Sequence, residues 1–380
     1  MNRTRIMYVA ETVGGGVRKH LLQLIDGLNP DDFELHLIYG PRYDAVFASR
    51  MNELQSSHKV HLIYLPDLQR ALSVQHDSAA IRQTAQVIKD IRPDIVHCHS
   101  SKAGIIGRVA AKMGGVHKVF YTPHAYAFDA PEFSKSKREL FIMAERWASR
   151  LATTCTFNVS EGEFRNALRH HIDKPSKFDV IYNGVPDTPH PSHAEARTRL
   201  GLDGIVPADA LIVGCAAWLD ARKDPMTFVR IAEQVIRQRA EAHFVYIGNG
   251  DLHDTVMAYV HEHHLDGNVH VLDYREDAST LVSAFDVYLL ASLYEGMPYS
   301  LIEAAQAGVP IAATRTTGND EVVIPGTNGE LFAVGDVNGG AQAVQHLLDN
   351  PPTSQQVRDT YLARFTEQQM LEHIVQWYKR

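Results

Sequence analysis

The stretch Ser292-Leu-Tyr-Glu-Gly-Met-Pro-Tyr-Ser-Leu-Ile-Glu303 predicts a strand that turns tightly into a helix, with a carboxylate on each side of the turn. Glu295 follows the apolar run 287–291, which has the length of a buried strand, and Glu303 falls inside the helix expected next. Carboxylates in these two places can each accept hydrogen bonds from hydroxyl groups.

The turn between these carboxylates also predicts an anion site. Gly296 permits a tight turn, and Pro298 suits the first helical position, where its missing N–H costs nothing. The N–H groups of Tyr299, Ser300 and Leu301 would then point outward at the positive end of the helix dipole. A phosphate site flanked by two hydroxyl acceptors suits a sugar joined to a nucleoside diphosphate.

Short apolar runs alternate with helical patterns on both sides of this stretch, which predicts parallel sheets with helices on both faces. Strands are expected at 6–10, 34–39, 60–65, 95–97, 119–122, 154–158, 180–182, 211–216, 243–247, 269–272, 287–291 and 310–313. Helices are expected at 17–28, 78–91, 102–112, 136–152, 161–169, 226–239, 254–263, 280–284, 298–307, 339–348 and 355–378. The proline-rich segment 184–193 predicts a linker, so we expect an α/β fold with Rossmann-like, doubly wound domains at 1–185 and 186–359, facing each other across a cleft.

Composition is that of an ordinary globular protein, with 45% hydrophobic and 22% charged residues. No apolar run approaches the roughly 18 residues of a transmembrane helix. The first run, 6–10, is too short for a secretory signal, so a cytoplasmic protein is expected. Cys98, Cys155 and Cys215 lie far apart in apolar contexts, which predicts reduced core thiols and no metal motif.

Charge divides unevenly between the halves. Residues 1–185 hold 24 Lys and Arg against 19 Asp and Glu, whereas residues 186–380 hold 13 against 26. The basic first half predicts an anionic partner for that half. No nucleic-acid partner is expected.

Three further segments carry candidate site residues. Gly15 and Gly16, in a run of three glycines between strand and helix, would let a phosphate or sugar approach the backbone, although a plain tight turn explains them equally well. His124 follows an apolar strand, where a structural and a functional histidine are about equally expected. Arg222 and Lys223 precede a helix starting near Pro225, where they would contact a diphosphate, or else form a solvated pair.

The order of these motifs resembles the retaining nucleotide-sugar glycosyltransferases of family 4, which have the GT-B architecture of two facing Rossmann-like domains. The resemblance covers essentially the whole chain. It rests on Gly-Gly-Gly-Val at 14–17, His-Ser-Ser-Lys at 99–102, Pro-His at 123–124, Ile-Tyr-Asn-Gly-Val at 181–185, Lys-Asp-Pro at 223–225, Ile-Gly-Asn-Gly at 247–250, Tyr-Glu-Gly-Met-Pro at 294–298 and Glu-Ala-Ala-Gln-Ala-Gly-Val-Pro at 303–310.

The resemblance implies a role for each candidate residue. Glu295 would hold the donor sugar's hydroxyls, Glu303 the ribose, and Lys223 the diphosphate. The remaining implied contacts are the diphosphate with the amides of Ser300 and Leu301, the nucleotide base with Tyr274 and Arg275, the phosphate and acceptor with Gly15 and Gly16, and the sugar near its reacting carbon with His124. The last helix, about 360–380, would cross back to pack on the first domain.

Two positions depart from the family pattern. Trp218 stands where the family commonly has an arginine that binds diphosphate, and Arg222 could replace part of that charge. A weakened or lost activity is the competing consequence. Ala125 stands where the family usually has glycine, and its methyl group could alter the donor pocket.

The family's mechanism implies front-face attack, in which the leaving phosphate takes the acceptor's proton. No Asp-x-Asp motif accompanies the donor site, so no cofactor and no metal are expected.

The implied acceptor is an undecaprenyl-diphosphate-linked glycan at the inner face of a bacterial membrane, with a UDP-sugar favoured over a GDP-sugar as donor. Segment 131–150 mixes basic and apolar side chains, as a membrane-surface helix or an ordinary packing helix would. The alternatives are a soluble acceptor, a non-catalytic nucleotide-sugar-binding protein and, more remotely, a sugar-nucleotide 2-epimerase of the same architecture.

Overall fold

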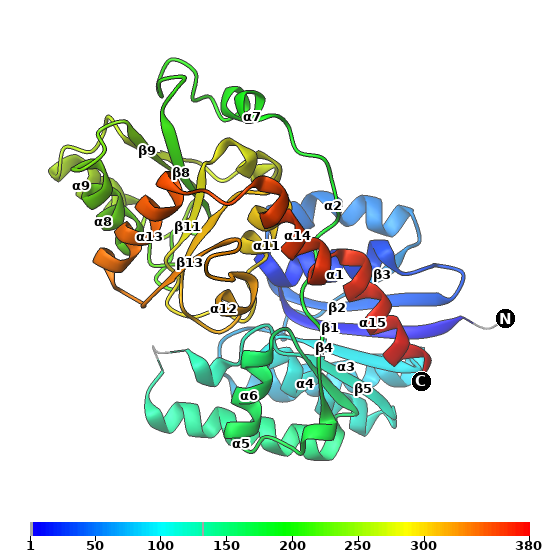
Figure 1. The fold of residues 1–380 in the computed structure, drawn as a ribbon. Coiled ribbons are helices and arrows are strands. Elements are labelled where there is room, and N and C mark those ends of the chain that lie inside the picture. The colour runs from blue at the N-terminus through cyan, green and yellow to red at the C-terminus, as the bar shows by residue number, and fades with distance from the viewer. Residues whose placement is uncertain (1–2, 131–132) are drawn as a thin grey trace. The chain divides into compact units, whose positions relative to one another are not determined.

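The computed structural model describes residues 3–130 and 133–380, so two residues of the basic segment, 131 and 132, lie outside the described part. The chain forms two compact units. The first runs to Asn183 and takes back Met370–Arg380, and the second is Gly184–Gln369. Each unit is a parallel sheet with helices on both faces, so the predicted doubly wound α/β class is confirmed (Figure 1).

The first unit has a seven-stranded sheet in the order β3-β2-β1-β4-β5-β6-β7. Its strands are β1 Thr4–Val13, β2 Phe33–Tyr43, β3 Val60–Tyr64, β4 Ile95–His99, β5 Lys118–Thr122, β6 Cys155–Asn158 and β7 Phe178–Val180. Its helices are α1 Gly15–Gly27, α2 Ala45–Ser56, α3 Val74–Ile91, α4 Ser101–Met113, α5 Lys135–Ala152, α6 Glu161–Arg169 and most of α15 Glu367–Lys379.

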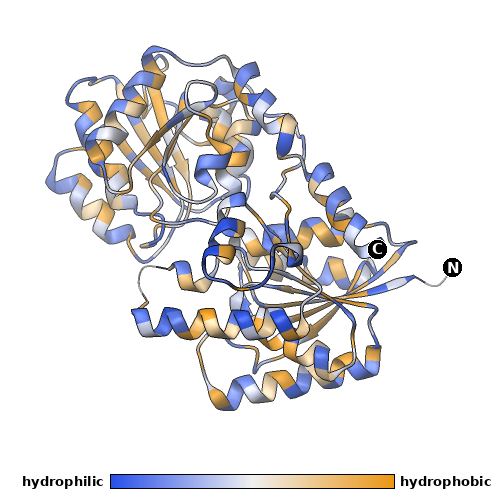
Figure 2. Cartoon of the chain, turned by 60° about the horizontal axis from the view of Figure 1, so that its bottom comes forward, coloured by the Kyte–Doolittle hydropathy of each residue, from blue (hydrophilic) through white to orange (hydrophobic). Residues whose placement is uncertain are grey.

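Alternation along β1 assigns helices to the two faces of this sheet. Ile6 and Tyr8 join a core cluster with apolar residues of α1, α2 and α15. Met7 and Val9 join a second cluster with α3, α4 and α5, because successive strand side chains point to opposite faces. Figure 2 shows the strands mostly in hydrophobic colours, as expected for strands buried on both sides.

The second unit has a six-stranded sheet in the order β10-β9-β8-β11-β12-β13. Its strands are β8 Leu211–Ala216, β9 Ala242–Ile247, β10 Val269–Leu272, β11 Val287–Leu290, β12 Ile311–Thr314 and β13 Gly329–Phe332. Its helices are α7 His193–Arg199, α8 Pro225–Ile236, α9 His253–Glu262, α10 Ala278–Leu281, α11 Tyr299–Gln306, α12 Asn319–Val322, α13 Val337–Asp349 and α14 Ser354–Arg364.

Two of the predicted helices differ from the structure. Pro298 is the residue before α11 and not its first helical residue, because its backbone is extended (φ −75°, ψ 124°). The helical pattern 355–378 is two helices, α14 and α15, separated at Phe365 and Thr366. Thr366 and Gln369 exchange side-chain and backbone hydrogen bonds, which is a capping box that starts the new helix.

In both sheets the strand order reverses at one point, between β1 and β4 and between β8 and β11. Ligands of doubly wound sheets bind beyond the carboxyl ends of the strands at such points. The predicted site residues follow these strands or their neighbours.

Candidate functional site

A buried ion pair marks the reversal point of the second unit. Lys223, between β8 and α8, donates from Nζ to Glu295 Oε1 at 2.5 Å, and Glu295 lies in the loop after β11. Both side chains are almost wholly buried, with relative exposures of 9% and 7%. Arg222 Nη1 lies 3.9 Å from the other oxygen, Glu295 Oε2. The structure therefore brings together three of the predicted donor-site residues.

Local hydrogen bonds fix the loop that carries Lys223. The Lys223 N–H donates to Asp220 Oδ1 at 3.0 Å, and Asp224 caps α8 by accepting from the Thr227 N–H at 3.2 Å. Asp224 has a left-handed backbone (φ 45°), which turns the chain sharply into the helix. The N–H of Leu293 donates to the carbonyl of Arg222 at 2.8 Å, so the loops after β8 and β11 are joined directly.

Electrostatics keep Glu295 ionised. Burial by itself raises the pKa of this carboxyl, but the charges of Lys223 and Arg222 outweigh it, and the pKa lies below its ordinary value. Glu295 is thus a fixed anion beside the cations Lys223 and Arg222, in the loops that follow the carboxyl ends of β8 and β11. Such a group accepts hydrogen bonds from sugar hydroxyls, while the cations attract phosphate.

Helix α11 begins directly after the Glu295 loop. The Leu301 N–H is directed at the carbonyl of Pro298 at 3.3 Å, which is a long hydrogen bond within the first turn. The sequence analysis expected this N–H to point freely outward. Glu303 lies two residues further along and is half-buried. Gly318 (φ 81°) packs its backbone against Gly296, where a Cβ atom would lie 2.1 Å from the carbonyl oxygen.

Trp218 follows β8, and its side chain meets that of Tyr274, which follows β10. Its ring lies parallel to that of Tyr274, with an interplanar angle of 12° and centroids 6.0 Å apart. Both rings are exposed, at 43% and 44%. The next residue, Arg275, is paired with Asp277 at 3.0 Å. Trp218, where the resemblance implies a diphosphate-binding arginine, therefore places an aromatic ring beside the predicted base contacts.

In the first unit, the glycine turn holds a carboxylate. Asp44 Oδ2 accepts from the Gly15 N–H at 3.2 Å and pairs with Arg18 Nη1 at 2.6 Å, while its other oxygen caps α2. Gly15 has φ 54°, a conformation that favours glycine. Gly16 follows in the first turn of α1. The backbone of this turn can therefore bind an anion, and the anion that it binds in this structure is the Asp44 carboxylate.

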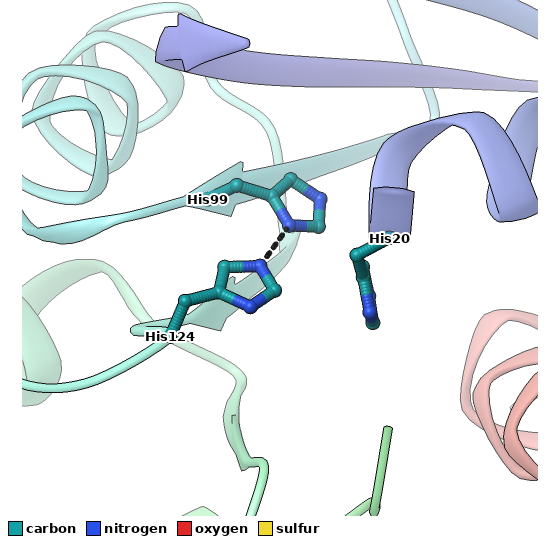
Figure 3. A group of neighbouring side chains, drawn as sticks. All are labelled: His20, His99 and His124. Carbon is teal, nitrogen blue, oxygen red and sulfur yellow. Dashed lines mark hydrogen bonds between the residues drawn. The ribbon is translucent and has the colours of Figure 1, made fainter. Parts of the chain in front are cut away.

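His124 lies within a histidine cluster that sequence reasoning missed (Figure 3). His99 Nδ1 and His124 Nε2 are 3.1 Å apart, and the ring of His20 meets that of His124 edge-on. Burial lowers the pKa of His20 to about 4, although a hydrogen bond with Asn183 acts in the opposite direction and raises it. Burial also holds the pKa of His99 and of His124 well below the usual range. The rings are therefore neutral at neutral pH. The position of His99 at a strand's carboxyl end was the available signal.

The backbone after β5 is strained and held by a buried carboxyl. His124 and Ala125 have φ 54° and 85°. Glu163 Oε1 accepts from the Ala125 N–H at 2.5 Å and Oε2 from the Val159 N–H at 2.9 Å. Burial raises the pKa of Glu163 to about 7. The departure from glycine at position 125 therefore affects backbone conformation, since only glycine adopts such a φ without strain.

Within residues 3–130 and 133–380, two groups of side chains could hold a metal ion. One is His20, His99 and His124, and the other is Glu34, His36 and His61 at the β2–β3 edge. Each group has ligand atoms within 4.8 Å of one another. In the described part of the chain, no helix is both long and apolar enough to span a bilayer.

Comparison with known proteins gives a consistent family. Residues 14–188 match the family described as Glycosyltransferase Family 4, and residues 210–350 match Glycosyl transferases group 1. The chain is 28% identical over 349 residues to the UDP-Gal:alpha-D-GlcNAc-diphosphoundecaprenol alpha-1,3-galactosyltransferase of Escherichia coli, covering 88% of this chain and 85% of that one.

A second relative, the N-acetyl-alpha-D-glucosaminyl L-malate synthase of Bacillus anthracis, is 24% identical over 282 residues, with 72% and 70% coverage. The fold matches that of Anabaena Alr3699/HepE, solved with UDP and glucose. That match has a TM-score of 0.81 at 17% identity and covers 99% of this chain and 100% of that one.

Proposed function

The chain belongs to the family 4 glycosyltransferases and is a hexosyltransferase, and from this premise we propose that it moves a sugar, with retention, from a UDP-sugar to a lipid-diphosphate-linked glycan. The observation that carries the donor half of this proposal is the buried Lys223–Glu295 pair beside the N-terminus of α11. A relative named for UDP-Gal and a neighbour solved with UDP support the choice of UDP over GDP.

In this proposal each part of the UDP-sugar donor contacts particular residues of the chain. Glu295 holds the hydroxyls of the sugar, and Glu303 holds the ribose. Lys223 and Arg222 contact the diphosphate together with the backbone of Ser300 and Leu301. The other proposed contacts are Tyr274 and Arg275 with the base, Gly15 and Gly16 with the phosphate and acceptor, and His124 with the sugar near its reacting carbon.

The proposed reaction needs no protein nucleophile. The acceptor hydroxyl attacks the anomeric carbon on the face that the diphosphate leaves, and its proton passes to the departing phosphate oxygen. Lys223 and Arg222 stabilise the negative charge that grows on that oxygen. Since two cations already serve the leaving group, we propose that transfer needs neither a metal ion nor a cofactor.

An exposed apolar stripe on α5 supports a membrane-bound acceptor. Leu140, Met143, Trp147 and Leu151 recur at helical spacing and are each 52–54% exposed, while the opposite side of α5 packs into the core. A helix with such a stripe and a basic flank can lie at an anionic lipid surface.

The basic flank lies on α5 itself. Lys137 sits with Nζ 4.0 Å from the ring of Phe133, and Arg150 bonds the carbonyl of His171 at 2.9 Å, so both cations are held beside the stripe. We propose that this face of α5 contacts the inner surface of a bacterial cytoplasmic membrane, where the lipid-linked acceptor resides.

The test is nucleotide release from UDP- and GDP-hexoses with two kinds of acceptor: an undecaprenyl-diphosphate-linked sugar in vesicles, and small soluble hydroxy acids. The proposal expects UDP release with the lipid-linked acceptor alone. Turnover on soluble acceptors only would instead favour transfer of a sugar to a hydroxy acid, the reaction for which the Bacillus anthracis relative is named. Tight donor binding with no turnover on any acceptor would favour the alternative of a non-catalytic nucleotide-sugar-binding protein, in which Trp218 replaces the arginine needed for transfer.

A further inference from the structure

Three histidines from different elements gather at the carboxyl edge of the seven-stranded sheet (Figure 3). His20 comes from α1, His99 ends β4, and His124 follows β5 by two residues. Since β1, β4 and β5 are neighbours in the sheet, the elements that follow them deliver the rings to one place. One nitrogen from each ring lies within 4.8 Å of one from each of the others.

We propose that His20, His99 and His124 form a binding site for one divalent transition-metal ion of the zinc type. Imidazole nitrogen is a preferred ligand of zinc, copper and nickel, whereas magnesium and calcium prefer oxygen. Three protein nitrogens leave a fourth position for water or a ligand, as in zinc sites that remain open. His124 is the only one of the three rings with appreciable exposure, so the ion enters from its side.

The spacing of two rings already fits such an ion. With bonds of about 2.0–2.1 Å, a tetrahedral zinc ion holds its nitrogens about 3.3 Å apart. His99 Nδ1 and His124 Nε2 are 3.1 Å apart and share a hydrogen bond, so one ion can take the place of the shared proton once the donor ring carries its proton on its other nitrogen. The ring of His20 lies 4.8 Å, centroid to centroid, from that of His124. Its ligand nitrogen lies within 4.8 Å of the other two, so a side-chain rotation that brings it closer completes the set.

The backbone beside the proposed ligands has an unusual conformation. Ser100, His124 and Ala125 have φ of 66°, 54° and 85°. Strained non-glycine residues of this kind cluster at ligand sites; His124 is one of the proposed ligands, and Ser100 and Ala125 directly follow His99 and His124.

Metal binding and sugar transfer would compete for one ring, a consequence that rests on the proposed function. Zinc bound through His124 removes that imidazole from the donor sugar. The ion is therefore an inhibitor in this account, and the metal site itself is tested without any turnover.

The test is zinc binding by the full chain, measured by calorimetry in the absence of substrate. His20→Gln and His99→Gln are compared with His61→Gln, which alters the second group and serves as the matched control. We expect one ion per wild-type chain, at least tenfold weaker binding in His20→Gln and His99→Gln, and wild-type binding in His61→Gln. Wild-type affinity in His20→Gln, or loss of the tight site in His61→Gln alone, overturns the proposal.

A second measurement needs no variant and so covers a failure of the variants to fold. Zinc X-ray absorption of the wild-type chain with one equivalent of zinc should show three imidazole ligands. A first shell made mainly of carboxylate or water oxygen overturns the proposal. Inhibition of transfer by zinc, reversed by a chelator, is expected for the wild type and reduced in His20→Gln.

Discussion

Replacing Lys223 with methionine tests whether the buried Glu295 carboxylate depends on this cation for its stability. Without Lys223, the charge of Glu295 would remain buried and lose its nearest partner. Methionine keeps most of the side-chain volume and removes the cation 2.5 Å from the carboxylate. Breaking a buried pair by removing one partner costs about 3–5 kcal/mol, because the remaining charge stays desolvated. We expect the second unit to lose about 3 kcal/mol of unfolding free energy at pH 7, measured by urea denaturation followed by circular dichroism and fluorescence.

The pH dependence of that loss carries the physical reasoning. In the wild type the pKa of Glu295 lies below its ordinary value, so its contribution to stability is present at neutral pH and is lost as the pH falls. In Lys223→Met, burial prevails and raises the pKa of Glu295, so stability is instead lost as the pH rises. The difference between wild type and variant should therefore grow from pH 5 to pH 8.

Arg222→Met is the matched control for this experiment. Arg222 lies 3.9 Å from Glu295 and its side chain is 36% exposed, so its removal should cost about 1 kcal/mol or less. A pH-independent loss in Lys223→Met, or equal losses in the two variants, would refute the reasoning.

Three other variants test particular features of the site. Ala125→Gly should raise the unfolding free energy by up to about 1 kcal/mol, because φ 85° strains alanine; a fall on thermal denaturation would contradict this. Glu163 has its pKa raised to about 7, so its protonated form contributes stability below about pH 4.5 that is lost as the pH rises through 7; Glu163→Gln should remove this fall from the ΔG–pH curve, and an unchanged slope would contradict it. Trp218→Ala should weaken UDP binding by about fivefold, since Tyr274 loses its stacked partner; unchanged affinity by calorimetry would place the base elsewhere.

Sequence periodicity was sufficient to predict the strands of both sheets, with the exception of β13. Strands buried on both faces form continuous apolar runs, and these are visible in a single sequence. β13 begins with Gly329, whose missing side chain lets the backbone approach Ile311 closely. It therefore lacks the apolar signal. Helix α2 was missed for a related reason, because only Phe47 and Leu54 are buried along it.

The candidate site was predictable where it follows strand ends and not where it depends on three-dimensional contacts. Lys223 and Glu295 are 72 positions apart, and the adjacency of β8 and β11 alone brings them together. The same holds for His20, which reaches His99 and His124 from a helix. Asp44 reaches the glycine turn from a different loop, a contact that no local pattern contains.

The most direct test of the central claim is transfer of labelled hexose from a UDP-hexose to an undecaprenyl-diphosphate-linked sugar in vesicles, by wild type and by Glu295→Gln. Glu330→Gln serves as a control on β13, outside the proposed donor contacts. Loss of a charged contact made in the transition state lowers the rate by roughly 10²–10³. The account predicts labelled lipid with the wild type and Glu330→Gln, and a loss of that order in Glu295→Gln. Equal rates for all three proteins, or label appearing only in soluble products, would contradict it.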